Sequence, residues 1–175
     1  MVPTVGFGLR QRRSHLRGIG YAPRATTGGA VGTLIQKLAV AYAIMFFAIV
    51  GMNYVPLCHD ESGMMFGLFS LQWYDDLLHG FSGVWAAVAA YLSARASVLY
   101  FKLFGAVYLF DGVLGLVTGS GCLDGGIFID GFRSLSDVEA PTRFFANLPH
   151  LLIGGIAVYI GFVLAKRLTG ALRPA

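Results

Sequence analysis

The chain has 175 residues, of which 56% are hydrophobic and only 13% are charged. A soluble globular domain usually carries about 25% charged residues, so this composition is typical of a protein that resides in lipid. The net charge of +4 does not indicate nucleic acid as a partner, because the basic residues follow the loop pattern of a membrane protein.

Four apolar runs of the sequence have the length that a helix needs to cross a bilayer, about 20 residues. In chain order they cover Leu34–Val55, Trp73–Leu92, Val98–Thr118 and Phe144–Leu164. The short link between the second and third runs predicts that these two helices are antiparallel. We therefore predict an all-α fold, a four-helix transmembrane bundle within residues 33–166.

The charged residues predict the orientation of this bundle. Eleven of the thirteen Lys and Arg residues lie at or before the start of the first run, between the second and third runs or near the start of the third, or after the fourth. Eight of the nine acidic residues lie in or beside the two other loops. Because basic loops stay in the cytoplasm, both termini are predicted to be cytoplasmic. Residues 1–32 then form a basic cytoplasmic arm and residues 167–175 a cytoplasmic tail.

The two halves of the chain are similar, which predicts that a helical hairpin was duplicated in tandem. Aligning Cys58 with Cys122 places a Cys-x-Asp sequence at the start of both external loops. After seven extra residues in the second loop, Asp-x-x-His-x-x-x-Gly in the second run aligns with Asn-x-x-His-x-x-x-Gly in the fourth. Such two-helix copies share one orientation, so a pseudo-two-fold axis along the membrane normal is expected.

Three ionisable residues inside the predicted spans are the candidate functional residues: His79, His150 and Asp111. Ionisable groups within a membrane span are costly and need a partner or a function. Counted along the helices, each lies about 9 to 11 Å below the external end of its span. We therefore expect the three side chains to converge on one inward-facing polar layer.

Four neighbouring residues are expected to support the two histidines. Asp76 and Asn147 lie one turn before them, at the i,i+3 spacing that brings helical side chains together, and are expected to orient the imidazoles. Gly83 and Gly154 follow one turn after the histidines and leave room for a flat cofactor or a neighbouring backbone. The histidines could thus bind a haem as axial ligands, contact a quinone or pigment, or only hold the helices together.

The two cysteines, Cys58 and Cys122, occupy equivalent starts of the two external loops, which predicts a structural disulfide in an oxidising compartment. A redox role would normally use a Cys-x-x-Cys pair, and the sequence has none. It also lacks a haem-attachment sequence, a Walker loop and a His-Glu-x-x-His zinc sequence. The sequence therefore predicts no metal site and no catalytic residues, which makes an enzyme the less favoured reading.

Residues 34–165 resemble an uncharacterised bacterial family of four-helix membrane proteins of unknown function. The resemblance rests on the stripes from Asp76 to Gly83 and from Asn147 to Gly154, and on the helix GAVYLFDGVLG between them. Asp76 replaces an Asn of the family pattern, and Asp111 replaces an apolar or small residue. The resemblance implies the four-helix fold, with the bacterial inner membrane as the expected location, and implies no activity.

Three functional hypotheses follow from these patterns. The leading one is a non-enzymatic membrane component, either an accessory subunit of a larger complex or a bundle that associates with itself. The second is an electron carrier that binds haem or another cofactor through His79 and His150. The third is a small transporter or proton pathway centred on Asp111. All three place the chain in the lipid bilayer, and none involves nucleic acid.

Overall fold

The computed structural model describes residues 27–67, 71–119, 121–123, 125–129 and 139–170. Most of the predicted basic arm and the last five residues of the predicted tail lie outside the described residues. Within the described part, all regular elements are helical, and the single β-type contact is an isolated antiparallel bridge between His59 and Met65. The all-α prediction is confirmed for this part of the chain.

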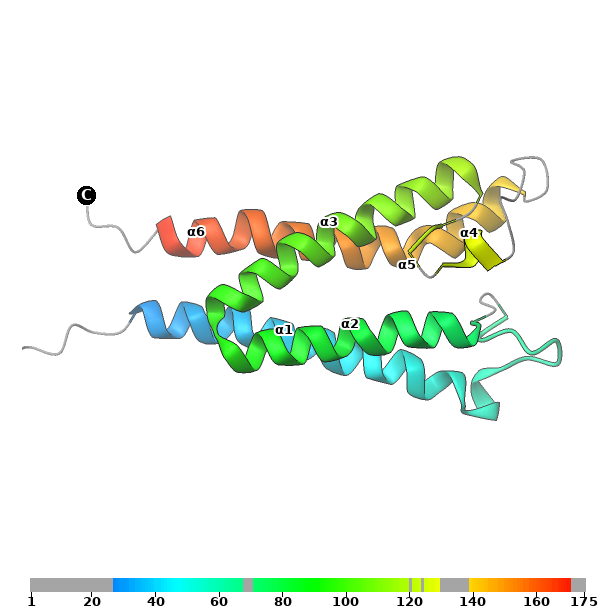
Figure 1. Cartoon of the computed structure of the whole chain (residues 1–175), viewed down its shortest axis with the longest axis horizontal. Coiled ribbons are helices and arrows are strands. Elements are labelled where there is room, and N and C mark those ends of the chain that lie inside the picture. Colours follow the sequence, from blue (N-terminus) through cyan, green and yellow to red (C-terminus); the bar gives the residue numbers. More distant parts are fainter. Residues whose placement is uncertain (1–26, 68–70, 120, 124, 130–138, 171–175) are drawn as a thin grey trace, which may run out of the picture.

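Four long helices make up most of the structure (Figure 1), and they are α1 (Thr27–Asn53), α2 (Trp73–Leu92), α3 (Ala94–Thr118) and α5 (Ala140–Val158). Helix α5 continues through a π-helical segment, η2 (Tyr159–Leu164), into the short α6 (Ala165–Gly170). Two short elements lie in the loops, namely the 3-10 turn η1 (Pro56–Cys58) after α1 and α4 (Gly126–Ile129) after α3.

Three helical stretches are long and apolar enough to cross a membrane, namely Gly32–Asn53, Ala94–Thr118 and Ala140–Leu168. Three of the four predicted spans are therefore confirmed as apolar helices of sufficient length. Helix α2 forms over the predicted residues but does not belong to this set. The physical reason is local, since Asp75, Asp76 and His79 lie in its first two turns and lower its mean hydropathy.

Two helix pairs build the bundle, because α1 packs along α2 and α3 packs along α5 (Figure 1). Ser93 is the single residue between α2 and α3. The chain turns at this residue, whose backbone is extended. Its side-chain oxygen accepts the N–H of Ala96 at 3.1 Å, which caps the start of α3. Ser97 then donates to the carbonyl of Ala89 at 3.1 Å, so the turn is fixed to the end of α2.

An aromatic core joins the two helix pairs. Tyr100, Phe104 and Tyr108 follow one another at four-residue spacing on α3, so they share one buried face of that helix. Tyr100 stacks on Phe104 at a ring distance of 5.0 Å, and Phe104 lies 4.1 Å from Tyr108. Phe46 of α1 packs edge-on against Phe104 at 5.4 Å. This core extends through Tyr108 to His150 and through Phe46 to His79.

Candidate functional site

Asp111 and His150, two of the three predicted residues, contact each other directly. Asp111 lies on α3 with only 2% of its side chain exposed, and its Oδ2 is 3.0 Å from Nδ1 of His150 on α5. The other carboxylate oxygen, Oδ1, accepts the backbone N–H groups of Cys122 and Leu123 at 2.7 and 2.9 Å. One buried carboxylate therefore connects two helices and the loop that follows α3.

Two glycines allow this loop to reach Asp111. Helix α3 ends at Gly119, whose φ of 82° is the left-handed conformation that glycine adopts without strain. At Gly121, an added Cβ would lie 2.9 Å from Oδ2 of Asp111. A side chain at position 121 would therefore push the loop away from the carboxylate, and glycine is what permits the close approach.

The third predicted residue, His79, is connected to this pair through aromatic rings. His79 is buried on α2, and its ring stacks on Phe46 of α1 at a centroid distance of 5.8 Å and an angle of 29°. Phe46 lies 5.8 Å from Tyr108, and Tyr108 meets the edge of His150 at 5.1 Å. The contact path from one histidine to the other therefore runs through Phe46 and Tyr108.

Tyr108 also carries a hydrogen bond between helices. Its hydroxyl lies 3.2 Å from the hydroxyl of Ser82, which follows His79 by three residues on α2. The sequence shows Ser82 only as one of several small residues suited to helix packing. Tyr108 lies three residues before Asp111, on the same side of α3, and that spacing is the signal by which it could have been found.

Asp76 makes contacts that differ from the expected ones. It is buried, and its Oδ2 accepts hydrogen bonds from Asn53 Nδ2 at 3.0 Å and from the Tyr54 hydroxyl at 2.8 Å. Its Oδ1 has no hydrogen-bond partner among the described residues. The hydrogen bond and the nearby negative charge raise the pKa of Tyr54. These contacts connect the start of α2 to the end of α1, where we expected Asp76 to orient His79.

Asn147 likewise makes contacts other than the expected one with His150. Its Nδ2 donates to the carbonyl of Arg143 on the same helix at 2.9 Å. Its amide also fills the space beside Gly115 of α3, where an added Cβ would collide with it. The Nδ1 atom of His150 faces Asp111 instead, so in this structure the acidic residue on α3 is the group that orients the imidazole.

Gly83 and Gly154 leave room for neighbouring helices, which was one of their two expected roles. A Cβ at Gly83 would lie 3.2 Å from the Cβ of Phe46 on α1. A Cβ at Gly154 would collide with the backbone of Tyr108 and Leu109 on α3. Each glycine thus lets α2 or α5 approach the partner helix of its own pair, and the space is filled by protein.

The predicted disulfide is not formed, since neither Cys58 nor Cys122 takes part in a disulfide in the structure. Cys58 ends η1 beside the α1–α2 pair, and its carbonyl accepts the N–H of Phe66 at 2.8 Å. Cys122 is held through its backbone at Asp111, in the α3–α5 pair. The two cysteines therefore belong to different helix pairs. Among the described residues, no group of three His, Cys, Asp or Glu could hold a metal ion.

The chemistry of the Asp111–His150 pair follows from its contacts. The pair of Asp111 and His150 can share a proton, while the loop amides stabilise negative charge on the carboxylate. A haem held by both histidines would require Phe46 and Tyr108 to move out of the contact path between them.

No protein-family model, curated protein or solved structure matches the chain.

Proposed function

We propose that this chain is a small integral membrane protein with four spanning helices and that it serves as a non-enzymatic component of a membrane assembly. One observation carries the proposal: four buried polar side chains bind another helix or the adjoining loop, namely Asp76, Ser82, Ser97 and Asp111. The resemblance to a bacterial four-helix family points the same way and favours the bacterial inner membrane. A bundle whose polar groups are used for cohesion is suited to an accessory or interaction role.

The polar contacts join nearly every neighbouring element of the bundle. Tyr42 of α1 donates to the carbonyl of Ile153 on α5 at 2.9 Å. Gln36 of α1 donates to the carbonyl of Ala90 on α2 at 2.7 Å, and Asp111 joins α3 to α5. Hydrogen bonds of this kind hold membrane helices together without any catalytic purpose.

The two alternatives have less support from the same contacts. An electron carrier would need His79 and His150 to face a common cofactor, whereas two aromatic rings connect them. A proton pathway would need Asp111 to exchange protons with water, yet its side chain is almost fully buried and both oxygens are bonded.

The surface of α2 supports the proposal that this helix spans the membrane together with the three apolar helices. Its polar residues Asp76 and His79 are buried against α1. Its exposed side includes Leu77, Phe81 and Val84, which are 63%, 68% and 51% exposed. These residues recur at helical spacing and form an apolar stripe on the outside. A helix that hides its polar groups and exposes apolar side chains is well adapted to lipid.

Cysteine labelling in intact cells tests the four spans and their orientation. Cys58 and Cys122 should react with a membrane-impermeant maleimide added outside the cell. In a Cys58→Ser, Cys122→Ser background, Ser93→Cys at the exposed turn after α2 should react only after lysis. Labelling of position 93 from outside would mean that α2 does not cross the membrane. Protection of both native cysteines in intact cells would reverse the orientation.

The functional proposal is tested by crosslinking the tagged chain in its membrane and purifying it in mild detergent. We expect a defined protein partner, or a second copy of this chain, to be retained, and a visible spectrum without a Soret band. A Soret band that His79→Leu or His150→Leu removes would contradict the proposal and support the electron carrier. A monomer that retains no partner would contradict the assembly role.

A further inference from the structure

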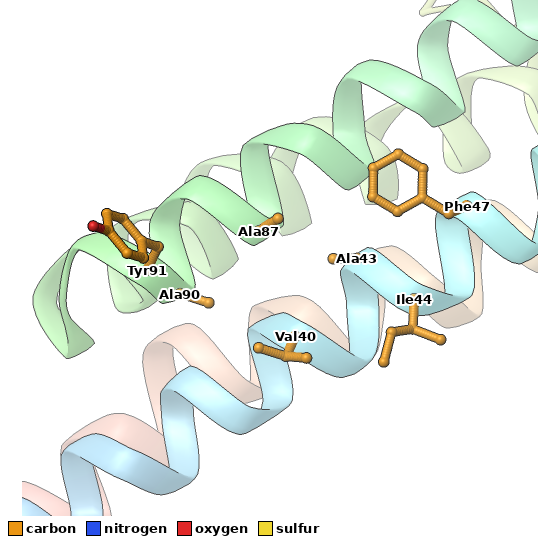
Figure 2. A pocket seen from close by; sticks show the side chains of 7 residues that line it. All are labelled: Val40, Ala43, Ile44, Phe47, Ala87, Ala90 and Tyr91. Carbon is orange, nitrogen blue, oxygen red and sulfur yellow. The ribbon is translucent and has the colours of Figure 1, made fainter.

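An apolar groove of about 440 Å³ lies between α1 and α2 on the outside of that helix pair (Figure 2). This volume is within the range of small-ligand pockets. Ala43, Ala87 and Ala90 lie between the two helices, with Phe47 toward one end and Tyr91 toward the other. Small side chains in the middle leave the hollow, and the larger ones border it.

One end of this groove is level with basic side chains. The hydrogen bond from Gln36 to the carbonyl of Ala90 places the start of α1 beside the end of α2. Lys37 therefore lies at the height of Tyr91, and it is exposed. Arg95 is also exposed and lies in the first turn of α3, four residues after Tyr91. Lys37 and Arg95 thus lie at the end of the helix pair where Tyr91 borders the groove.

Acidic side chains are found only at the opposite end of the described structure. The described acidic residues are Asp60, Glu61, Asp75, Asp76, Asp111 and Glu139. They lie in the loop after α1, in the first turn of α2, in the second half of α3 and just before α5. No described carboxylate therefore neutralises the basic groups beside Tyr91.

We propose that this groove binds an anionic phospholipid, with one acyl chain along Ala43, Ala87 and Ala90 and the phosphate facing Lys37 and Arg95. The apolar lining matches an acyl chain, and the positive end matches a phosphate that carries negative charge. Basic residues at a membrane surface attract anionic lipids, and guanidinium groups bind phosphate well. The proposal rests on the chain spanning the membrane, which the labelling experiment tests separately.

The test compares lipid retention by the full chain in detergent micelles that contain equal amounts of phosphatidylglycerol and phosphatidylcholine. Native mass spectrometry counts the lipids that remain bound, and we expect phosphatidylglycerol to be retained in preference. The double variant Lys37→Gln, Arg95→Gln should weaken this retention by about 30-fold, roughly fivefold for each basic residue. The matched control Lys166→Gln, Arg167→Gln removes two exposed charges from α6 and should leave the preference unchanged.

A second pair of variants tests the groove itself. Ala87→Phe should fill the hollow and reduce retention of phosphatidylglycerol, whereas Ala106→Phe on the exposed side of α3 should not. Circular dichroism and gel filtration report whether each variant is folded, and Ala87→Leu replaces the Phe variant if that one is not. Equal retention of both lipids, or full retention by the groove variants, would overturn the proposal. Equal losses in the α6 control, or a second copy of the chain in the groove, would also overturn it.

Discussion

Asp111 on α3 and His150 on α5 are joined by a buried contact of 3.0 Å between Oδ2 and Nδ1. Removing one partner leaves the other without its counterpart inside the bundle, which is strongly destabilising. We expect His150→Leu to lower the free energy of unfolding by about 3 kcal/mol. Thermal unfolding in detergent micelles, followed by circular dichroism, measures the loss.

The double variant Asp111→Leu, His150→Leu shows whether the two residues act as a pair. If they do, the double variant should lose clearly less stability than the sum of the two single variants. Losses that simply add would contradict a direct interaction between Asp111 and His150.

Tyr42 connects α1 to α5 through a hydrogen bond from its hydroxyl to the carbonyl of Ile153. We expect Tyr42→Phe to reduce stability by about 0.6 kcal/mol, the average for such a bond between membrane helices. The control is Tyr91→Phe, because the side chain of Tyr91 is 88% exposed. Equal unfolding temperatures for the two variants would argue against the contact.

Gly154 and its neighbour Gly155 offer a matched comparison on α5. An added methyl group at Gly154 would collide with the backbone of α3, whereas the space beside Gly155 is open. We expect Gly154→Ala to cost about 1 to 3 kcal/mol through overpacking and Gly155→Ala to be tolerated. Thermal unfolding of both variants checks this, and a stable Gly154→Ala protein would show that the two helices are further apart.

Asp60 organises the loop after η1, because its Oδ1 accepts hydrogen bonds from the Ser62 hydroxyl and from the backbone N–H groups of Ser62 and Met64. These bonds lower the pKa of the Asp60 carboxyl below its ordinary value of 3.8. A lowered folded-state pKa means that the carboxylate stabilises this loop above pH 3.8. That contribution is lost as the pH falls through the folded-state pKa.

The amide chemical shifts of Ser62 and Met64 report this titration by NMR. We expect a midpoint below 3.8, and no such titration in Asp60→Asn, which keeps an acceptor oxygen but has no ionisable group. A midpoint at or above 3.8 would mean that the hydrogen bonds do not hold the ionised carboxylate.

The helices were predictable because the apolar runs, and the residues that favour helix starts and ends, indicate their positions clearly. The predicted limits Trp73–Leu92 coincide with α2. Helix α5 begins at Ala140, earlier than the predicted Phe144, since Pro141 in its first turn favours a helix start. The direction in which the polar residues of α2 face was not predictable, because Asp76 and His79 are buried against α1 and a count of apolar residues contains no information on side-chain direction.

The candidate site was predictable only where an ionisable side chain lies inside an apolar run of the sequence. Ionisable residues inside apolar runs identified Asp111 and His150, and the count along each helix placed them at one level. Phe46 could not be distinguished from an ordinary core residue, because aromatic side chains are common throughout these helices, and Tyr108 could be distinguished only by its three-residue spacing from Asp111. The contacts of Asp76 with Asn53 and Tyr54 were not predictable, because spacing within one helix says nothing about residues that follow on its neighbour.

The loop after α3 is bound to Asp111 through main-chain N–H groups of Cys122 and Leu123. Because every residue except proline carries such a donor, these two positions can change identity over evolution while the attachment persists. Position 121 has no such freedom, since its missing side chain is what admits Oδ2 of Asp111. Relatives of this protein should therefore keep the acid of α3 together with a glycine at position 121, and should vary freely, short of proline, at the two residues that make the bonds.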